Sequence, residues 1–389
     1  MDSDTTQLLT ETAGVDAGFG MVEETFRTKG AEAVFDALIR KAREDSNYRM
    51  VFSVRLMQVR HRLGLPLVDP DPVPKLTEEQ RPVYDQACRE AALETGQLFL
   101  DSGDIAAAWP YFRAVGERAP VAAAIEGITA SDERVESVIE IAFKDGVSPR
   151  KGFELIIEHR GICSAITWFG YNRDYDSRLE CLKLLVRSIY QQVAEALKES
   201  IAAAEGSVPA TANVGELIAG RPWLFEGPSS YVDSTHLTSI LRFAPELEDD
   251  ATIRMAVELC DYGDKLNEMY HFRGDPPFED TYLDHAVYLR ALLGEDVDRA
   301  IAHFRAKIEG SLDPTTGAEV LIELLVRLNR YEEAIQASRE FFPDPSRPSA
   351  NCPSLLQLCQ MAGDHAKMRA LAKEQGDLVG FAAGVIQST

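Results

Sequence analysis

A repeat of 34 residues in the C-terminal part of the chain constrains its fold most strongly. The segments 298–304 and 332–338 each hold an alanine followed by isoleucine, and these alanines, Ala300 and Ala334, are 34 positions apart. A weaker third copy at 363–369 follows about one repeat later. A period of this length is typical of helix hairpins that stack, because each hairpin buries one face only against its neighbour.

Residues 77–120 have the features of one complete hairpin. Thr77 and Gln80 form the pattern of a capping box, which predicts the start of a helix that runs to about Asp101. Further along, Gly96 and Ala108 are small residues at which two helices can approach closely, and Phe99 and Phe112 are the large residues that fill the hairpin. Pro120 then ends the hairpin.

These two stretches resemble the tetratricopeptide repeat, in its period and in the offsets of its small and aromatic residues. The resemblance covers residues 77–120 and 280–375, and it departs from the family where Ala92 and Thr95 replace the motif's Trp and Leu. It implies a superhelix of helix hairpins whose concave face holds an extended segment of a partner protein.

The chain contains no alternating apolar and polar run of strand length with hairpin turns, so we expect an all-α fold. The fold class predicted is a tetratricopeptide-like α-helical hairpin solenoid, a superhelix, with an irregular middle segment. The expected segments are a flexible N-terminus (1–20), a helical hairpin (21–64), a proline-rich connector (65–76), tetratricopeptide-like helices (77–160), an aromatic and helical middle segment (161–275) and C-terminal tetratricopeptide-like repeats (276–389).

The charge balance narrows the choice of partner. With 63 acidic and 40 basic residues the net charge is −23, which argues against nucleic acid and against anionic membranes as partners. A basic protein segment remains compatible, as does an acidic surface that serves solubility alone. The six cysteines form no Cys-x-x-Cys pair, the start lacks the pattern of a secretory signal, and no apolar stretch reaches membrane-spanning length, so we expect a cytoplasmic protein.

The middle segment holds the residues that could line a ligand or partner groove. These are two aromatic groups and three histidines: Trp168, Tyr171, Trp223, His236, His271 and His285. Two simpler interpretations stand beside this one. Isolated histidines at the surface or core edge need no ligand, and large aromatic side chains commonly fill a junction between two parts of a solenoid.

No stretch carries a catalytic, nucleotide-binding or metal-binding motif, and no cofactor is expected. Asn172, Asp174 and Asp176 resemble the front of a calcium loop, but Ser177 and Lys183 stand where that loop needs Gly and Glu. The favoured function is therefore a protein–protein interaction scaffold rather than an enzyme. The alternative is a small-molecule- or metal-binding enzyme that uses the middle segment.

Overall fold

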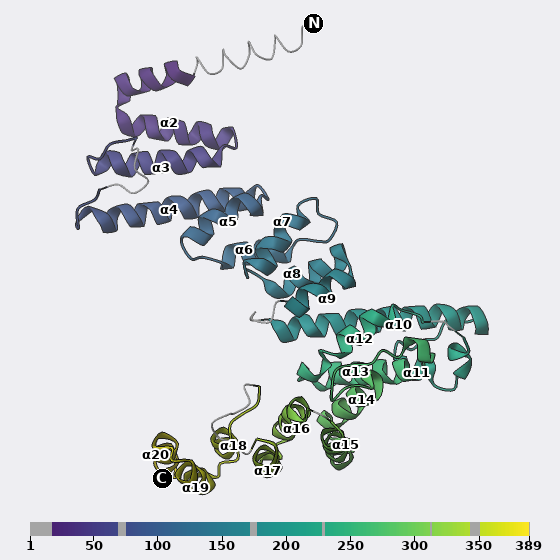
Figure 1. Cartoon of the computed structure of the whole chain (residues 1–389). Helices are drawn as coiled ribbons and strands as arrows, with labels where there is room; N and C mark the ends of the chain where they lie inside the picture. The colour runs from purple at the N-terminus through teal and green to yellow at the C-terminus, as the bar shows by residue number, and fades with distance from the viewer. Residues whose placement is uncertain are drawn as a thin grey trace. The chain divides into compact units, whose positions relative to one another are not determined.

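The all-α fold is confirmed. The computed structural model describes residues 18–68, 75–171, 177–227, 230–311, 313–342 and 351–388, and these residues form helices and turns with no β-strand (Figure 1). The nearest approach to a sheet in them is one isolated bridge between Arg273 and Asp280. Most of the predicted N-terminus, residues 69–74 of the connector, and the acidic turn at 172–176 lie outside the described residues.

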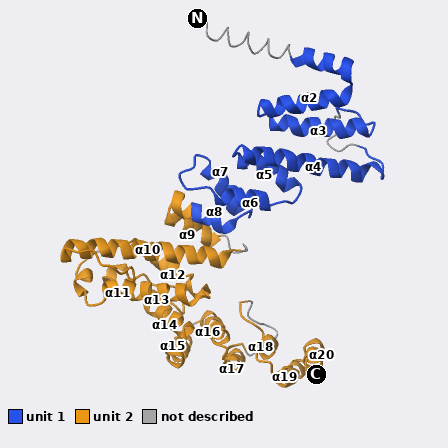
Figure 2. Cartoon of the chain, turned by 180° about the vertical axis from the view of Figure 1, so that it is seen from behind, with its two compact units in different colours: residues 1–155 blue, residues 156–389 orange. Residues whose placement is uncertain are grey.

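The chain divides into two compact units, residues 1–155 and residues 156–389 (Figure 2). In each unit helices pack mainly against their neighbours in the chain, which is the arrangement of an α-helical solenoid. The predicted segment ranges stay predictions, and so does the tetratricopeptide character of the repeats.

In the first unit, short turns join most of the labelled helices, whereas a longer stretch, residues 63–79, joins two of them. The elements are α2 (Ala31–Glu44), α3 (Tyr48–Arg62), α4 (Gln80–Asp101), α5 (Ile105–Ala114), α6 (Ala119–Glu126), α7 (Val135–Ile139), the π-helical turn η1 (Glu140–Lys144) and α8 (Pro149–Leu155). Helix α3 begins where the Asn47 side chain accepts a hydrogen bond from the Met50 amide, as an N-cap does. One apolar face of α2 and one of α3 then form a small core that contains Phe35, Ile39 and Val54.

The close approach predicted within residues 77–120 is present. A Cβ atom added to Gly96 of α4 would lie 2.7 Å from the ring of Phe112 on α5, so only glycine admits this ring without a shift. The Thr77 and Gln80 pair is also present, because each side chain accepts a hydrogen bond from the other residue's backbone amide.

The second unit contains the predicted middle segment and the C-terminal repeats. Its first elements are η2 (Ile156–Arg160), α9 (Ile162–Tyr171), α10 (Arg178–Glu205), α11 (Val214–Ile218), η3 (Pro222–Phe225), α12 (Ser234–Leu241), η4 (Ala244–Glu246), α13 (Asp250–Asp264) and η5 (Glu268–Tyr270). The sequence pattern also predicts a helix from Asp249 to His271, and this prediction is wrong at its C-terminal end, since α13 stops at Asp264. Gly263 lies in the last turn of α13, and the ring of Tyr282 from α14 packs directly on it because glycine has no side chain.

The long helix α10 organises the middle segment. At its start the Arg178 guanidinium lies 4.0 Å from the centroid of the Phe169 ring and binds both carboxylate oxygens of Glu246, at 2.6 and 2.7 Å. Further along, the Tyr190 hydroxyl donates to Glu258 of α13 and accepts from the Val214 amide at the start of α11. These contacts fix α9, α11 and α13 around α10.

The remaining helices continue in sequence. They are α14 (Thr281–Leu292), α15 (Val297–Glu309), α16 (Thr315–Arg327), α17 (Tyr331–Phe341), α18 (Leu355–Met361), α19 (His365–Gln375) and α20 (Leu378–Ile386). The repeated segments that begin at 298 and 332 lie in the first turns of α15 and α17, and the segment 363–369 leads into α19. Ala300, Ala334 and Phe304 are all buried, as the repeat requires.

Candidate functional site

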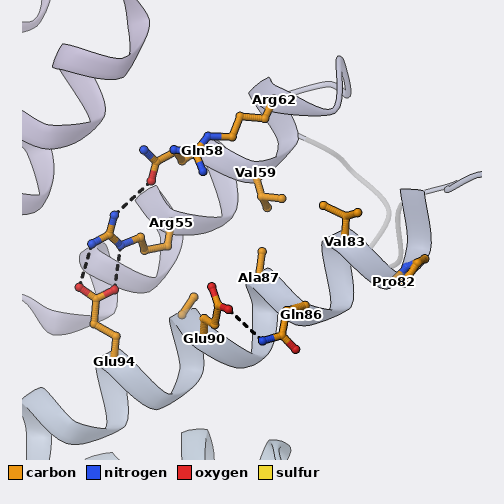
Figure 3. Close-up of a pocket in the computed structure, with 11 residues that line it drawn as sticks. Arg55, Gln58, Val59, Arg62, Pro82, Val83, Gln86, Ala87, Glu90 and Glu94 are labelled. Carbon is orange, nitrogen blue, oxygen red and sulfur yellow. Dashed lines mark hydrogen bonds and ion pairs between the residues drawn. The ribbon is translucent and has the colours of Figure 1, made fainter. Parts of the chain in front are cut away.

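A groove in the first unit lies between α3 and α4. It has a volume of about 710 Å³ and is open to solvent. Its walls combine apolar and charged side chains, namely Arg55, Gln58, Val59 and Arg62 from α3 and Pro82, Val83, Gln86, Ala87, Glu90, Ala91 and Glu94 from α4. Figure 3 shows Val59 and Val83 facing the space between the two helices, with the Arg55–Glu94 pair at one end of the groove and Arg62 at the other.

One end of this groove is closed by an ion-pair network. Arg55 binds both carboxylate oxygens of Glu94, at 2.7 and 3.0 Å, and Arg43 of α2 reaches the same carboxylate at 2.5 Å. The hydrogen bonds from Arg55 hold the pKa of Glu94 below its usual value although burial opposes this, and they raise the pKa of Arg55. Both groups therefore stay charged, and they keep α3 and α4 in register.

In the groove, α4 exposes an apolar and an acidic side chain to solvent. Val83 is 53% exposed on the first turns of α4. Glu90 lies about two helical turns after Val83. It is exposed and accepts a hydrogen bond from Gln86 at 2.8 Å, but no cation among the described residues pairs with it. The groove thus offers an apolar contact and a carboxylate within one stretch of α4.

None of the residues that line this groove is predicted from the sequence as a functional residue. The pattern that could have indicated it is the run Pro82–Val83 with Ala87 at helical spacing, because it puts apolar groups on a face of α4 that also carries Glu90. The packing of α3 against α4, which the connector joins, is a tertiary contact, and apolar periodicity within each helix does not predict it.

The predicted aromatic residues lie apart from this groove. Trp168 is half-buried on α9, with the Arg160 guanidinium 5.8 Å from its ring centroid. Tyr171, at the end of α9, is 85% exposed, and Trp223 is half-buried in η3. None of the three lines a cavity described here.

The predicted histidines take three different environments. His236 of α12 is 3.9 Å from Asp233. His271 is exposed, with Nε2 3.1 Å from the Leu266 carbonyl oxygen and its ring against Tyr282. His285 is 2% exposed and stacks on Phe278. His271 and His285 flank the same loop, and His285 lines a second cavity, of about 230 Å³.

A buried carboxylate that sequence reasoning missed lies beside His285. Asp284 is fully buried and accepts hydrogen bonds from His303 Nε2 at 2.8 Å and from Lys307 Nζ at 2.5 Å. Lys307 also binds Glu279 at 2.7 Å. Burial lowers the pKa of Lys307, but the bonds to Asp284 and Glu279 outweigh burial and raise it, and the bond from Lys307 lowers the pKa of Glu279. This network joins α14 to α15 and stabilises their pairing.

Other kinds of site are not formed by the residues described. Among them no group of three or more His, Cys, Asp or Glu side chains could hold a metal ion. Their helices include none that is both long enough and apolar enough to span a membrane. All six cysteines are free thiols.

The structure thus shows an all-α chain whose helices pack mainly on their neighbours, with a solvent-open groove between α3 and α4. No family model matches the chain, and neither the curated proteins nor the solved structures contain a significant match to it.

Proposed function

We propose that the protein is a cytoplasmic interaction scaffold that binds a basic segment of a partner protein in the groove between α3 and α4. The observation that carries this proposal is the juxtaposition of exposed Val83 with the unpaired carboxylate of Glu90 in a groove of about 710 Å³. An apolar contact flanked by a complementary charge is the usual composition of a specific interface.

Charge complementarity selects the occupant. The arginines of the groove are already engaged, since Arg55 binds Glu94 and Arg62 binds Glu32. Glu90 is left without a cation, and the whole chain carries a net charge of −23. A segment that places a Lys or Arg on Glu90 and an aliphatic side chain on Val83 satisfies both groups. The tetratricopeptide resemblance supports the same class of partner, but through a different surface of the repeat.

The test is a selection of displayed random peptides on the purified chain. We expect enrichment of peptides in which Lys or Arg lies near an aliphatic residue. Glu90→Lys should weaken the selected peptides about tenfold, which corresponds to about 1.4 kcal/mol, because like charges then face each other. Glu44→Lys is the matched control, since Glu44 is an exposed carboxylate of α2 outside the groove. Failure to enrich peptides, or equal binding by the Glu90→Lys protein, would refute the proposal.

The alternative of a small-molecule-binding enzyme has one supporting observation. This is the cavity beside His285, which lies at the end of the predicted middle segment. A binding site is the part of this alternative that the cavity supports, because its lining combines apolar and polar side chains.

A further inference from the structure

A second, smaller cavity in the second unit has the composition of a ligand site. It measures about 230 Å³ and lies between α12, the loop before α14, and the first turns of α14 and α16. Its walls carry Phe278, Pro277 and Val320 together with two arginines, Arg242 and Arg273. An apolar body with a few convergent polar groups is typical of small-molecule sites, and this volume lies below the roughly 300–1,000 Å³ of drug-sized pockets.

Neither arginine side chain forms an ion pair among the described residues, although Arg273 lies near enough to Glu279 to contribute to the lowered pKa of that carboxyl. Both are exposed, and neither guanidinium group makes a hydrogen bond or ion pair with a residue in the described part of the chain. Other arginines of the second unit, such as Arg178, Arg221 and Arg290, do bind carboxylates. Two guanidinium groups at one cavity favour an anion between them, and a carboxylate can bind an arginine through two parallel hydrogen bonds.

His285 supplies the third element of the site. Its Nδ1 is 2.6 Å from the Thr281 carbonyl oxygen, which can only accept, so Nδ1 carries the proton. Burial lowers the pKa of the imidazole to about 4, and the ring is neutral at physiological pH. Its Nε2 is then an acceptor, and no donor among the described residues bonds to it. The buried ring thus presents one unfilled acceptor at the cavity.

We propose that this cavity binds a small organic acid whose carboxylate lies on Arg242 and Arg273 and whose O–H or N–H group donates to His285 Nε2. The body of the ligand packs between Phe278, Pro277 and Val320. This site shares no residue with the groove between α3 and α4 and lies in the other unit. The protein would then bind a small molecule as well as a partner segment.

The test uses para-hydroxybenzoate, benzoate and para-hydroxybenzamide as probes in saturation-transfer NMR. These probes carry both groups, only the carboxylate, and only the donor on a similar ring. We expect para-hydroxybenzoate to bind with a Kd of about 1 mM, benzoate about fivefold more weakly because one neutral hydrogen bond is lost, and the amide more weakly still. No binding of para-hydroxybenzoate at about 10 mM, or equal binding of all three probes, would overturn the proposal.

Protein variants locate the binding on the cavity. Arg242→Gln combined with Arg273→Gln should weaken para-hydroxybenzoate at least about tenfold, because two charged hydrogen-bond donors are lost. Arg299→Gln is the matched control, since Arg299 is an exposed arginine of the same unit that does not line the cavity. Unchanged denaturation midpoints in both proteins would show that the loss is local. Binding that survives the double substitution refutes the arginine site.

Discussion

At the scale of single residues, His285 makes the stability of the second unit depend on pH. Burial lowers its pKa from 6.5 to about 4; the Thr281 carbonyl and Asp284 favour the protonated ring, and Arg242 opposes it. Between these two values the unfolded chain binds a proton that the folded chain does not. Stability is therefore complete above pH 6.5 and falls as the pH is lowered toward 4.

The size of this effect can be measured. A difference of 2.5 pKa units (6.5 minus 4) corresponds to about 3 kcal/mol. Urea denaturation at both ends of the window should show this loss in the wild type, and a loss about 3 kcal/mol smaller in His285→Gln, which has no group that titrates there. An identical pH dependence in the two proteins would contradict the buried, neutral imidazole.

The buried carboxylate of Asp284 gives a second prediction at this scale. Lys307→Met leaves Asp284 with hydrogen bonds from His303 and from the backbone amide of Asp280. We therefore expect a loss of about 3 kcal/mol in the free energy of unfolding. Lys367→Met removes a lysine that binds Glu332 at the surface and should cost less than about 1 kcal/mol. Denaturant melts compare the two, and equal effects would mean that Asp284 does not depend on Lys307.

At the scale of helices, the 34-residue repeat predicts where small residues are required. Ala300 and Ala334 are buried on α15 and α17, so Ala300→Leu or Ala334→Leu should destabilise by about 1–3 kcal/mol through overpacking. Phe304→Ala should cost about 3–5 kcal/mol because it leaves a cavity. The exposed Ala302 of α15 is the control, since Ala302→Leu should change stability by about 0.5 kcal/mol or less. A melt of Ala300→Leu that matches the wild type would refute the repeat register.

Helices were predictable where local signals define both ends. The sequence pattern predicts helices from Asn47 to Leu63 and from about Arg178 to Ala204, and these agree with α3 and α10 because apolar periodicity is a property of nearby sequence. The expected helix over 249–271 failed at its end. There the chain turns because Tyr282 packs on Gly263, and that contact is set by a later helix.

The candidate sites were less predictable than the helices for the same reason. His285 is a candidate residue in the sequence analysis, but its burial is not visible in the sequence. The cavity beside it combines His285 with Arg242 and Arg273, which lie in three separate segments of the chain. The groove of Val83 and Glu90 depends on the pairing of α3 with α4. Side chains that meet only through tertiary packing leave no periodic pattern in the sequence.

At the scale of the whole molecule, the proline-rich connector should be the first site of proteolysis. Residues 65–76 contain Pro66, Pro70, Pro72 and Pro74, which lack backbone N–H donors, so this stretch has few hydrogen bonds to lose when a protease binds it. We expect the first cleavage between Leu65 and Lys75, identified by mass spectrometry during brief digestion. First cleavage within 296–342 would place the weakest part of the chain in the repeats instead.

The way the helices pair also sets an order in which the second unit can fold. Helices α15 to α20 meet mainly their immediate neighbours, whereas α10 is held by Glu246 and Glu258, each 68 residues away from its partner. Closing so long a loop costs chain entropy before any contact is gained, and local pairing costs little. Pulse-labelled hydrogen exchange during refolding should therefore show amides of α15 to α17 protected before those of α10. The C-terminal helices would then provide the surface on which the middle segment completes its core, although ribosomes synthesise that segment first.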